Sequence, residues 1–149
     1  MFNIFKTKQK KITDDVLGIL TFTKSKKLDE SYWNVERKIS SVKKLVEFYL
    51  YNNSDGINEN QKNLILEIEK KYPELINIFE RFLNEKLRKI DSDYSSVSIL
   101  KDLDVCFINI PEDPTESDKW EINYVEKKGF TIYGIEVENW NPIWLGISA

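Results

Sequence analysis

Histidine is absent from this sequence of 149 residues, and cysteine occurs only once. Without histidine the chain has no Ser-His-Asp or Cys-His catalytic arrangement and no histidine ligand for a metal. A zinc site needs several Cys or His side chains, so zinc is excluded as well. The five glycines are scattered and form neither a G-x-G-x-x-G sequence nor a P-loop, so we expect no phosphate-binding loop.

The single cysteine, Cys106, cannot form an internal disulfide, which favours a reducing compartment. It lies in the apolar run 105–108, and this predicts a small buried core residue rather than a nucleophile. No apolar run approaches the ~20 residues that a membrane-spanning helix needs. The first residues also lack the apolar core of a signal peptide. We therefore expect a cytoplasmic protein that does not contact a membrane.

Charge of neither sign dominates, since 22 basic and 25 acidic residues give a net charge of −3. This balance argues against a nucleic-acid-binding protein. The distribution is uneven, however, because lysines crowd the first eleven residues and acidic residues gather at 112–121. Both groups are typical of a solvated surface, and they are also consistent with an electrostatically polarised face for a partner.

The length fits one domain over residues 1–149, with the basic residues 1–11 as a frayed N-terminal segment. Residues 16–22 and 45–51 are rich in β-branched and aromatic side chains and predict strands. Residues 32–39 alternate apolar and polar side chains, which is the pattern of a half-buried antiparallel strand. The turn-forming residues 52–56 end this first group of three strands.

The apolar period changes between Glu59 and Ile90, where large apolar residues recur every three or four positions. This spacing predicts an amphipathic helix. Pro73 interrupts the pattern without shifting its phase, so we expect one kinked helix or two consecutive helices with Pro73 in the first turn of the second.

Strand patterns return in the C-terminal part, over residues 97–110, 120–125, 130–137 and 143–147. Residues 127–129 (Lys-Lys-Gly) predict a hairpin turn. Strands on both sides of a segregated helix predict an α+β fold. We expect an antiparallel sheet of six or seven strands, with the helical segment between strands 3 and 4 packed on one face.

Carboxylates are the only remaining candidates for acid–base catalysis. Asp102 and Asp104 form one pair two residues apart, and Glu136 and Glu138 form another, so each pair would share one face of a strand. Such spacing is also the ordinary pattern of a solvent-exposed strand. Residues 91–93 (Asp-Ser-Asp) lack the central Gly and terminal Glu of a calcium loop. We therefore predict no enzymatic activity, no cofactor and no metal site.

The four tryptophans are the more informative side chains. Trp33, Trp120 and Trp144 are expected in the core between sheet and helix. Trp140 stands between asparagines and before a proline, which predicts partial exposure. Tryptophan with flanking charge is typical of an anchor in a protein–protein interface.

The layout resembles a group of small bacterial domains of unknown function that are encoded beside polymorphic toxins and regarded as immunity proteins. The resembling features are residues 15–20 (Asp-Val-Leu-Gly-Ile-Leu), a strand with Trp33, a strand before Asn60-Gln61, a helical stretch from Asn63 to Leu87, and closing strands with Trp and Gly.

The resemblance implies an immunity protein that covers the active site of a cognate protein toxin. An acidic inhibitor suits a basic, nuclease-like target, because complementary charge speeds association and fixes the register. Trp140 is then the predicted anchor of partner binding. The predicted acidic partner-binding residues are Glu112, Asp113, Glu116, Asp118, Glu136 and Glu138.

Two alternatives stay open. The chain could be a structural or scaffold subunit, as a monomer or as a homodimer paired through the edge strand 143–147. It could also bind a small ligand, which would require a concave pocket with converging carboxylates.

Overall fold

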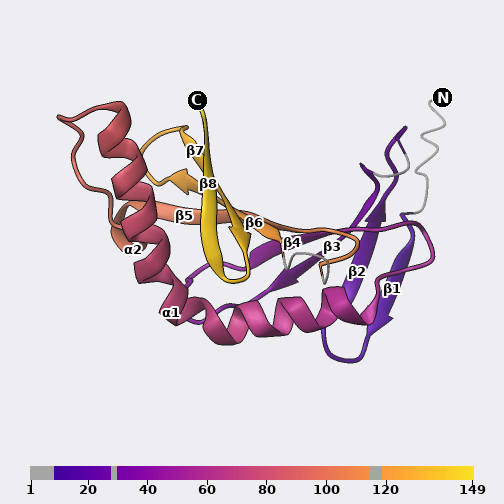
Figure 1. The fold of residues 1–149 in the computed structure, drawn as a ribbon. Coiled ribbons are helices and arrows are strands. Elements are labelled where there is room, and N and C mark those ends of the chain that lie inside the picture. The colour runs from indigo at the N-terminus through magenta and orange to yellow at the C-terminus, as the bar shows by residue number, and fades with distance from the viewer. Residues whose placement is uncertain (1–8, 28–29, 115–118) are drawn as a thin grey trace, which may run out of the picture.

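The computed structural model describes residues 9–27, 30–114 and 119–149. They form eight strands, one long helix and one short helix (Figure 1). In chain order these elements are β1 (Lys11–Asp14), β2 (Gly18–Thr23), β3 (Tyr32–Arg37), β4 (Val46–Tyr51), α1 (Glu59–Ile90), α2 (Ile99–Asp102), β5 (Leu103–Ile110), β6 (Trp120–Glu126), β7 (Ile132–Glu138) and β8 (Asn141–Ser148).

All eight strands belong to one sheet, and their order across it follows their order in the chain. Neighbouring strands are antiparallel except for β4 and β5, which are parallel. The predicted α+β class is confirmed. The prediction of a purely antiparallel sheet of six or seven strands is wrong, because the sheet is mixed and has eight strands.

The predicted place of the long helix, between strands 3 and 4, is wrong as well, since α1 lies between β4 and β5. The extra strand is β1, a short edge strand that begins at Lys11, the last residue of the segment expected to fray. The parallel pair follows from α1 itself. A helix that crosses the sheet returns the chain to the end where β4 began, so β5 runs in the same direction as β4.

One continuous helix, α1, occupies the whole predicted range Glu59–Ile90 and contains Pro73. Asn58 caps it, and Gln61 completes a reciprocal capping box. Pro73 has no N–H to offer the carbonyl of Glu69, which weakens the helix at this point. Figure 1 shows the helix axis changing direction partway along its length, and this agrees with the kinked helix predicted from the sequence.

The core lies between one face of the sheet and the apolar face of α1. Strands β4 and β7 alternate buried and half-buried side chains along their whole length. The buried set includes Phe48, Ile108, Ile122 and Ile135 from the sheet and Phe79 from the helix. The other face of the sheet carries the alternate residues of each strand.

Residues 97–110, predicted as one interrupted strand, form α2 and then β5. Ser98 caps α2, because its side chain accepts a hydrogen bond from the Lys101 backbone N–H. The predicted hairpin around residues 127–129 is confirmed, since it joins the antiparallel strands β6 and β7. The last strand, β8, forms an edge of the sheet as predicted.

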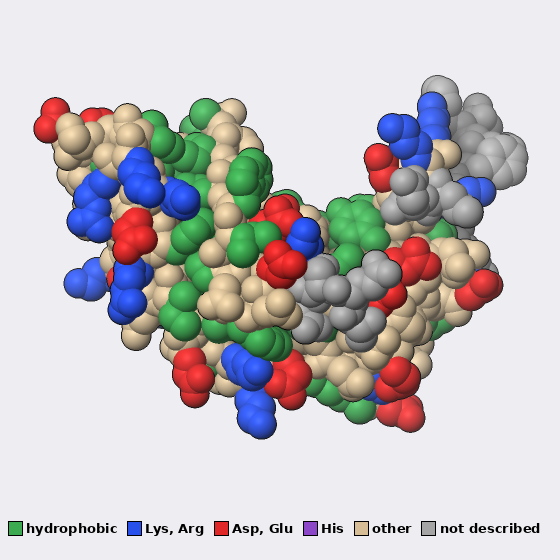
Figure 2. Space-filling model, viewed as in Figure 1, with side chains coloured by type: hydrophobic (Ala, Val, Ile, Leu, Met, Phe, Trp, Pro, Cys, Tyr) green, Lys and Arg blue, Asp and Glu red, His purple; other side chains and the backbone are tan. Residues whose placement is uncertain are grey.

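The sheet is strongly curved. In Figure 1, α1 runs along the lower side of the sheet while β1–β2 and β7–β8 rise at opposite ends. The space-filling view in Figure 2 shows a hollow between these raised ends, with acidic and apolar side chains exposed in it. The helix therefore covers one face, and the other face is left as a concave surface.

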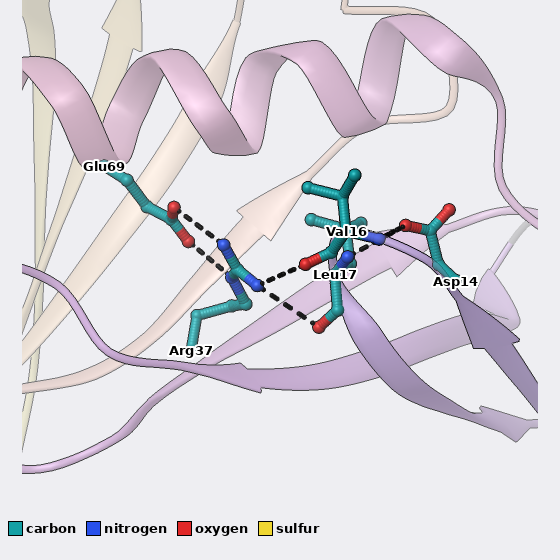
Figure 3. Close-up of polar contacts among 5 residues, drawn as sticks. All are labelled: Asp14, Val16, Leu17, Arg37 and Glu69. Atoms are coloured by element: carbon teal, nitrogen blue, oxygen red, sulfur yellow. Dashed lines mark hydrogen bonds and ion pairs between the residues drawn. The ribbon is translucent and has the colours of Figure 1, made fainter.

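Arg37 joins three parts of the fold (Figure 3). Its guanidinium makes two hydrogen bonds to Glu69 of α1, at 2.6 and 2.9 Å. It also donates to the backbone carbonyls of Val16 and Leu17 in the β1–β2 turn. The Glu69 carboxylate raises the pKa of Arg37. This contact fixes α1 against β3 and the first hairpin.

Candidate functional site

A single register line crosses the face of the sheet opposite α1. Each member is the direct cross-strand partner of the next, so the side chains of adjacent strands lie side by side. We call this set the open-face row. From β2 to β8 it consists of Thr21, Asn34, Tyr49, Asn109, Glu121, Glu136 and Trp144.

Every member of the open-face row is partly or fully exposed, whereas from β3 to β7 the residues on either side of it in each strand are buried. This difference follows from the period of two in a strand, which sends successive side chains to opposite faces. Figure 1 shows α1 on the opposite side of the curved sheet, so this row lies on the face that the helix does not cover.

Aromatic side chains occupy the middle of this face. The ring of Tyr32 lies 4.9 Å from that of Tyr49 and 5.9 Å from that of Tyr51, measured between centroids. Tyr49 in turn lies 5.3 Å from Phe107. These tilted and edge-on contacts are the favourable geometries for aromatic pairs. The result is a rigid aromatic cluster that crosses β3, β4 and β5.

Carboxylates flank the aromatic cluster on both sides. Glu47 accepts a hydrogen bond of 2.7 Å from the Tyr49 hydroxyl. Burial and then the Glu47 carboxylate raise the pKa of Tyr49 well above its ordinary value. Burial also raises the pKa of Tyr51, and the charge of Glu121 adds to this effect. The two tyrosines therefore stay neutral hydrogen-bond donors beside negative charge at physiological pH.

Two hollows lie along the open face. The first, of about 340 Å³, is mostly polar and is lined by residues of β2, β3 and β4 that include Asn34 and Glu47. The second, of about 180 Å³, lies across β4 to β7, and we call it the Glu121 pocket. It is lined by Tyr51, Asn109, Pro111, Lys119, Trp120, Glu121 and Glu136.

Glu121 is held in place by two amides. Its Oε1 accepts hydrogen bonds from the side-chain nitrogen of Asn123 at 2.7 Å and from that of Asn109 at 3.3 Å. Glu136 lies opposite Glu121 in the register and forms an ion pair with Lys119, with an N–O distance of 3.8 Å. Lys119 therefore pairs with Glu136 only, and no ion pair to Glu121 is found among the described residues.

The structure brings together only part of the predicted partner-binding set. Glu136 and Glu138 lie on β7 and face the open side of the sheet. Glu112 and Asp113 are exposed in the segment after β5, and the side chain of Asn58 donates to the backbone carbonyl of Glu112. Glu116 and Asp118 lie outside the described residues.

Trp140 is half-buried, as predicted, but it is engaged within the fold. It forms a two-residue turn with Asn139, and both residues have positive φ. This turn type matches the twist of a hairpin and favours asparagine at its first position. The ring of Trp140 packs edge-on against Trp120, with centroids 6.0 Å apart, and the Lys71 ammonium lies 4.0 Å from its centroid.

Two expectations about single residues are wrong. Cys106 is exposed rather than buried, because a bulge in β5 between Val105 and Phe107 breaks the alternation there. Partial burial of the thiol and the charge of Glu47 raise the pKa of Cys106, which disfavours the nucleophilic thiolate. Trp144 is 56% exposed on the edge strand rather than in the core.

The pair Asp102 and Asp104 does not share a strand face either. Asp102 ends α2 and accepts a hydrogen bond from the backbone of Ser98, while Asp104 belongs to β5 and pairs with Lys44. By contrast, Trp33 and Trp120 are buried in the core, as predicted.

Sequence reasoning missed the centre of this face, which is made by Tyr49, Asn109 and Glu121. The alternation of apolar and polar residues along 45–51 and 120–125 could have predicted the exposure of Tyr49 and Glu121. It assigns these side chains to the face of the sheet that points away from the core. What it could not supply was the parallel pairing of β4 with β5, which places Asn109 beside Tyr49.

Within residues 9–27, 30–114 and 119–149, no group of three or more His, Cys, Asp or Glu side chains could hold a metal ion. No helix in the same part of the chain is long and apolar enough to cross a membrane. No protein-family model matches the sequence, and neither a curated protein nor a solved structure matches it.

Proposed function

We propose that this protein is an immunity protein that binds a cognate bacterial toxin and neutralises it by covering the toxin's active site. The surface that we assign to binding is the open-face row with its aromatic cluster. The predicted residues Glu136 and Glu138 belong to this face, and Glu112 and Asp113 extend the acidic surface beyond the end of β5.

The observation that carries the proposal is the combination of aromatic rings and carboxylates on the face of the curved sheet that α1 does not cover. Rigid aromatic side chains are the common anchors of protein–protein interfaces. Carboxylates that surround them attract a basic partner and reject an acidic one. On this face Glu47, Glu121 and Glu136 stand beside the tyrosines, which favours a basic target such as a nuclease.

The functional test is protection of cells from the product of the neighbouring gene. Two variants are needed, and each converts three carboxylates to amides. The open-face triple variant carries Glu47→Gln, Glu121→Gln and Glu136→Gln. The remote triple variant carries Glu74→Gln, Glu85→Gln and Asp93→Asn, three exposed positions on α1 and the loop after it.

We expect the unchanged protein and the remote triple variant to restore growth, and the open-face triple variant to fail. Protection by all three proteins would contradict the assigned surface. Failure of the unchanged protein to protect or to form a complex with the neighbouring product would contradict the immunity function.

A homodimeric scaffold is the second candidate, and the edge strand β8 favours it. Ile143, Trp144 and Ile147 are exposed on this strand, and its outer edge is unpaired within the described residues. An exposed apolar edge is a template for pairing with a second copy. Concentration-dependent sedimentation, abolished by Ile147→Lys, would support this candidate, whereas a monomer at high concentration would exclude it.

A further inference from the structure

A cavity of about 210 Å³ lies at the end of the sheet where the parallel strands β4 and β5 begin. Residues 41–43 of the loop before β4 line one side of it, and α2 with the start of β5 lines another. Tyr72 of α1 and Tyr124 of β6 complete its wall, and we call it the tyrosine pocket. None of the described residues that line it belongs to the open-face row, so it is separate from the surface assigned to the toxin.

The two tyrosines leave one hydroxyl proton without an acceptor. Both residues are buried, with exposures of 1% and 0%, and their hydroxyl oxygens lie 2.8 Å apart. Burial raises the pKa of Tyr72 to about 12 and raises that of Tyr124 well above its ordinary value, so both hydroxyls keep their protons at physiological pH. Only one of the two protons can lie between the two oxygens. No acceptor for the other is found in the described part of the chain, although buried donors are nearly always paired.

The size and the walls of the tyrosine pocket favour a small apolar body. Val42, Ile99, Leu103 and Val105 supply apolar wall. A volume of about 210 Å³ is far larger than the ~10–15 Å³ that one water molecule needs, and it exceeds the ~150 Å³ of an engineered apolar cavity that binds benzene. It is smaller than the ~300–1,000 Å³ of a drug-sized site. A single aromatic ring with small substituents therefore fits.

Positive charge surrounds the same pocket. Lys43 and Lys127 line it, and the Lys127 ammonium donates a hydrogen bond of 3.1 Å to the carbonyl of Leu100. The carboxylate in the lining, Asp104, is paired with Lys44. Neither Lys43 nor Lys127 forms an ion pair with any residue that the structure describes. In a chain with a net charge of −3, this local excess of ammonium groups attracts an anion.

We propose that the tyrosine pocket binds a small hydroxyaryl carboxylate, which is one aromatic ring with a phenol oxygen at one end and a carboxylate at the other. The ring lies against the apolar walls, and the phenol oxygen accepts the unpaired proton of Tyr72 and Tyr124. The carboxylate faces Lys43 and Lys127. The reverse orientation is disfavoured, because a single hydroxyl donor does not offset the cost of burying a carboxylate.

Three probes test the proposal, each titrated into the methyl-labelled full chain and followed by NMR. They are 4-hydroxybenzoate, benzoate, which lacks the phenol oxygen, and phenol, which lacks the carboxylate. We expect 4-hydroxybenzoate to give saturable shifts of the methyl signals of Val42, Ile99, Leu103 and Val105. It should bind about fivefold more tightly than benzoate, because benzoate leaves the tyrosine proton unpaired, and at least about fivefold more tightly than phenol.

The double tyrosine variant, Tyr72→Phe with Tyr124→Phe, tests the inner end. Replacing both partners of a buried hydrogen bond by apolar groups of the same shape leaves no polar atom unpaired, so we expect the variant to fold. It should bind 4-hydroxybenzoate no more tightly than benzoate, and its affinity for benzoate should stay within about twofold of that of the unchanged protein.

The double lysine variant, Lys43→Gln with Lys127→Gln, tests the outer end. It should weaken the binding of both carboxylates by about fivefold and leave the affinity for phenol unchanged. The charge-matched control is Lys70→Gln with Lys89→Gln, two exposed positions on α1, and it should bind all three probes as the unchanged protein does.

The proposal is overturned if none of the probes gives saturable shifts of the wall methyl signals, or if the unchanged protein binds 4-hydroxybenzoate and benzoate equally. It is also overturned if the double tyrosine variant keeps its preference for 4-hydroxybenzoate, or if the double lysine variant binds both carboxylates with unchanged affinity. Should the double tyrosine variant fail to fold, the double lysine variant and the comparison of the three probes still decide the matter.

Discussion

Arg37 shows how one residue can join distant parts of this chain. Its guanidinium and the Glu69 carboxylate have side-chain exposures of only 21% and 18%, so solvent screens their interaction less than it screens a surface pair. The two parallel hydrogen bonds use the planar fork that arginine has and lysine lacks. The guanidinium also satisfies the carbonyls of Val16 and Leu17.

The first prediction concerns this contact. Arg37→Lys keeps the charge but loses the fork, and it should lower the free energy of unfolding by about 2 kcal/mol. Denaturant unfolding at pH 7 measures the change. Lys27→Ala, which removes an exposed pair with Glu30, is the control and should change stability by less than about 0.5 kcal/mol. An Arg37→Lys variant as stable as the unchanged protein would show that the pair is not a stabilising contact.

Asp14 gives a prediction about pH. The backbone N–H of Leu17, and then that of Val16 and the Lys62 ammonium, hold the pKa of Asp14 below its ordinary value, against the opposing effect of burial. A carboxyl group whose pKa is lower in the folded state stabilises the fold fully above its unfolded pKa of about 4. That stability is lost as the pH falls through the lower, folded pKa.

Asp14→Asn should therefore be less stable than the unchanged protein at pH 7, and the difference should shrink as the pH falls below about 4. Urea unfolding of both proteins over a series of pH values measures this. Asp15→Asn, at an exposed neighbouring position, should show no such trend. A difference that stays constant or grows on acidification would contradict the assignment.

The sequence predicted the helices and strands more accurately than it predicted the exposure of single residues. The amphipathic spacing predicted the full range of α1, because a long helix with one apolar face has an unambiguous pattern. The alternation in residues 120–125 and 130–137 likewise located β6 and β7 to within two residues. The short edge strand β1 escaped detection because its four residues are mostly exposed and carry no apolar alternation.

Residue-level exposure was predicted less well, for two physical reasons. Cys106 has an apolar sequence context, but the bulge in β5 is set by pairing with β6 and leaves no local signal. Trp144 follows a turn into an edge strand, where an apolar side chain need not be covered. The Glu121 pocket depends on four strands that meet in one register, and only the tertiary structure defines that register.

Gln61 links helix α1 to the candidate site. Its side chain is fully buried at the start of α1 and donates to the carbonyls of Tyr51 and Pro111. Its Oε1 accepts from Asn52 and from the backbone of Asn58. These four contacts tie the helix to the ends of β4 and β5, next to the Glu121 pocket.

Gln61→Leu keeps the volume but leaves buried carbonyls and an N–H without partners. We expect the free energy of unfolding to fall by about 3 kcal/mol, measured by denaturant unfolding at pH 7. Asn63→Ala, at an exposed position two residues further along the same helix, is the control and should be nearly neutral. A Gln61→Leu protein of unchanged stability would refute the role of this network.

At the scale of the whole molecule, the main feature is the difference between the two faces of one curved sheet. One face is covered by α1 and supplies the core. The other face carries tyrosines beside carboxylates, and Figure 2 shows a hollow between the raised ends of the sheet. The sequence showed acidic and aromatic residues in its second half, but only the topology places residues of β3 and β4 on the same surface.

The most direct test of the account is the dissociation constant for the partner identified by the protection assay, measured by calorimetry with the unchanged protein and both triple variants. We predict that the open-face triple variant weakens binding by roughly a hundredfold, and that the remote triple variant changes it by no more than about threefold. Both variants remove three negative charges. Equal losses of affinity would therefore show that binding depends on net charge rather than on this face. That result, or undiminished binding by the open-face triple variant, would contradict the claim that this face is the binding surface.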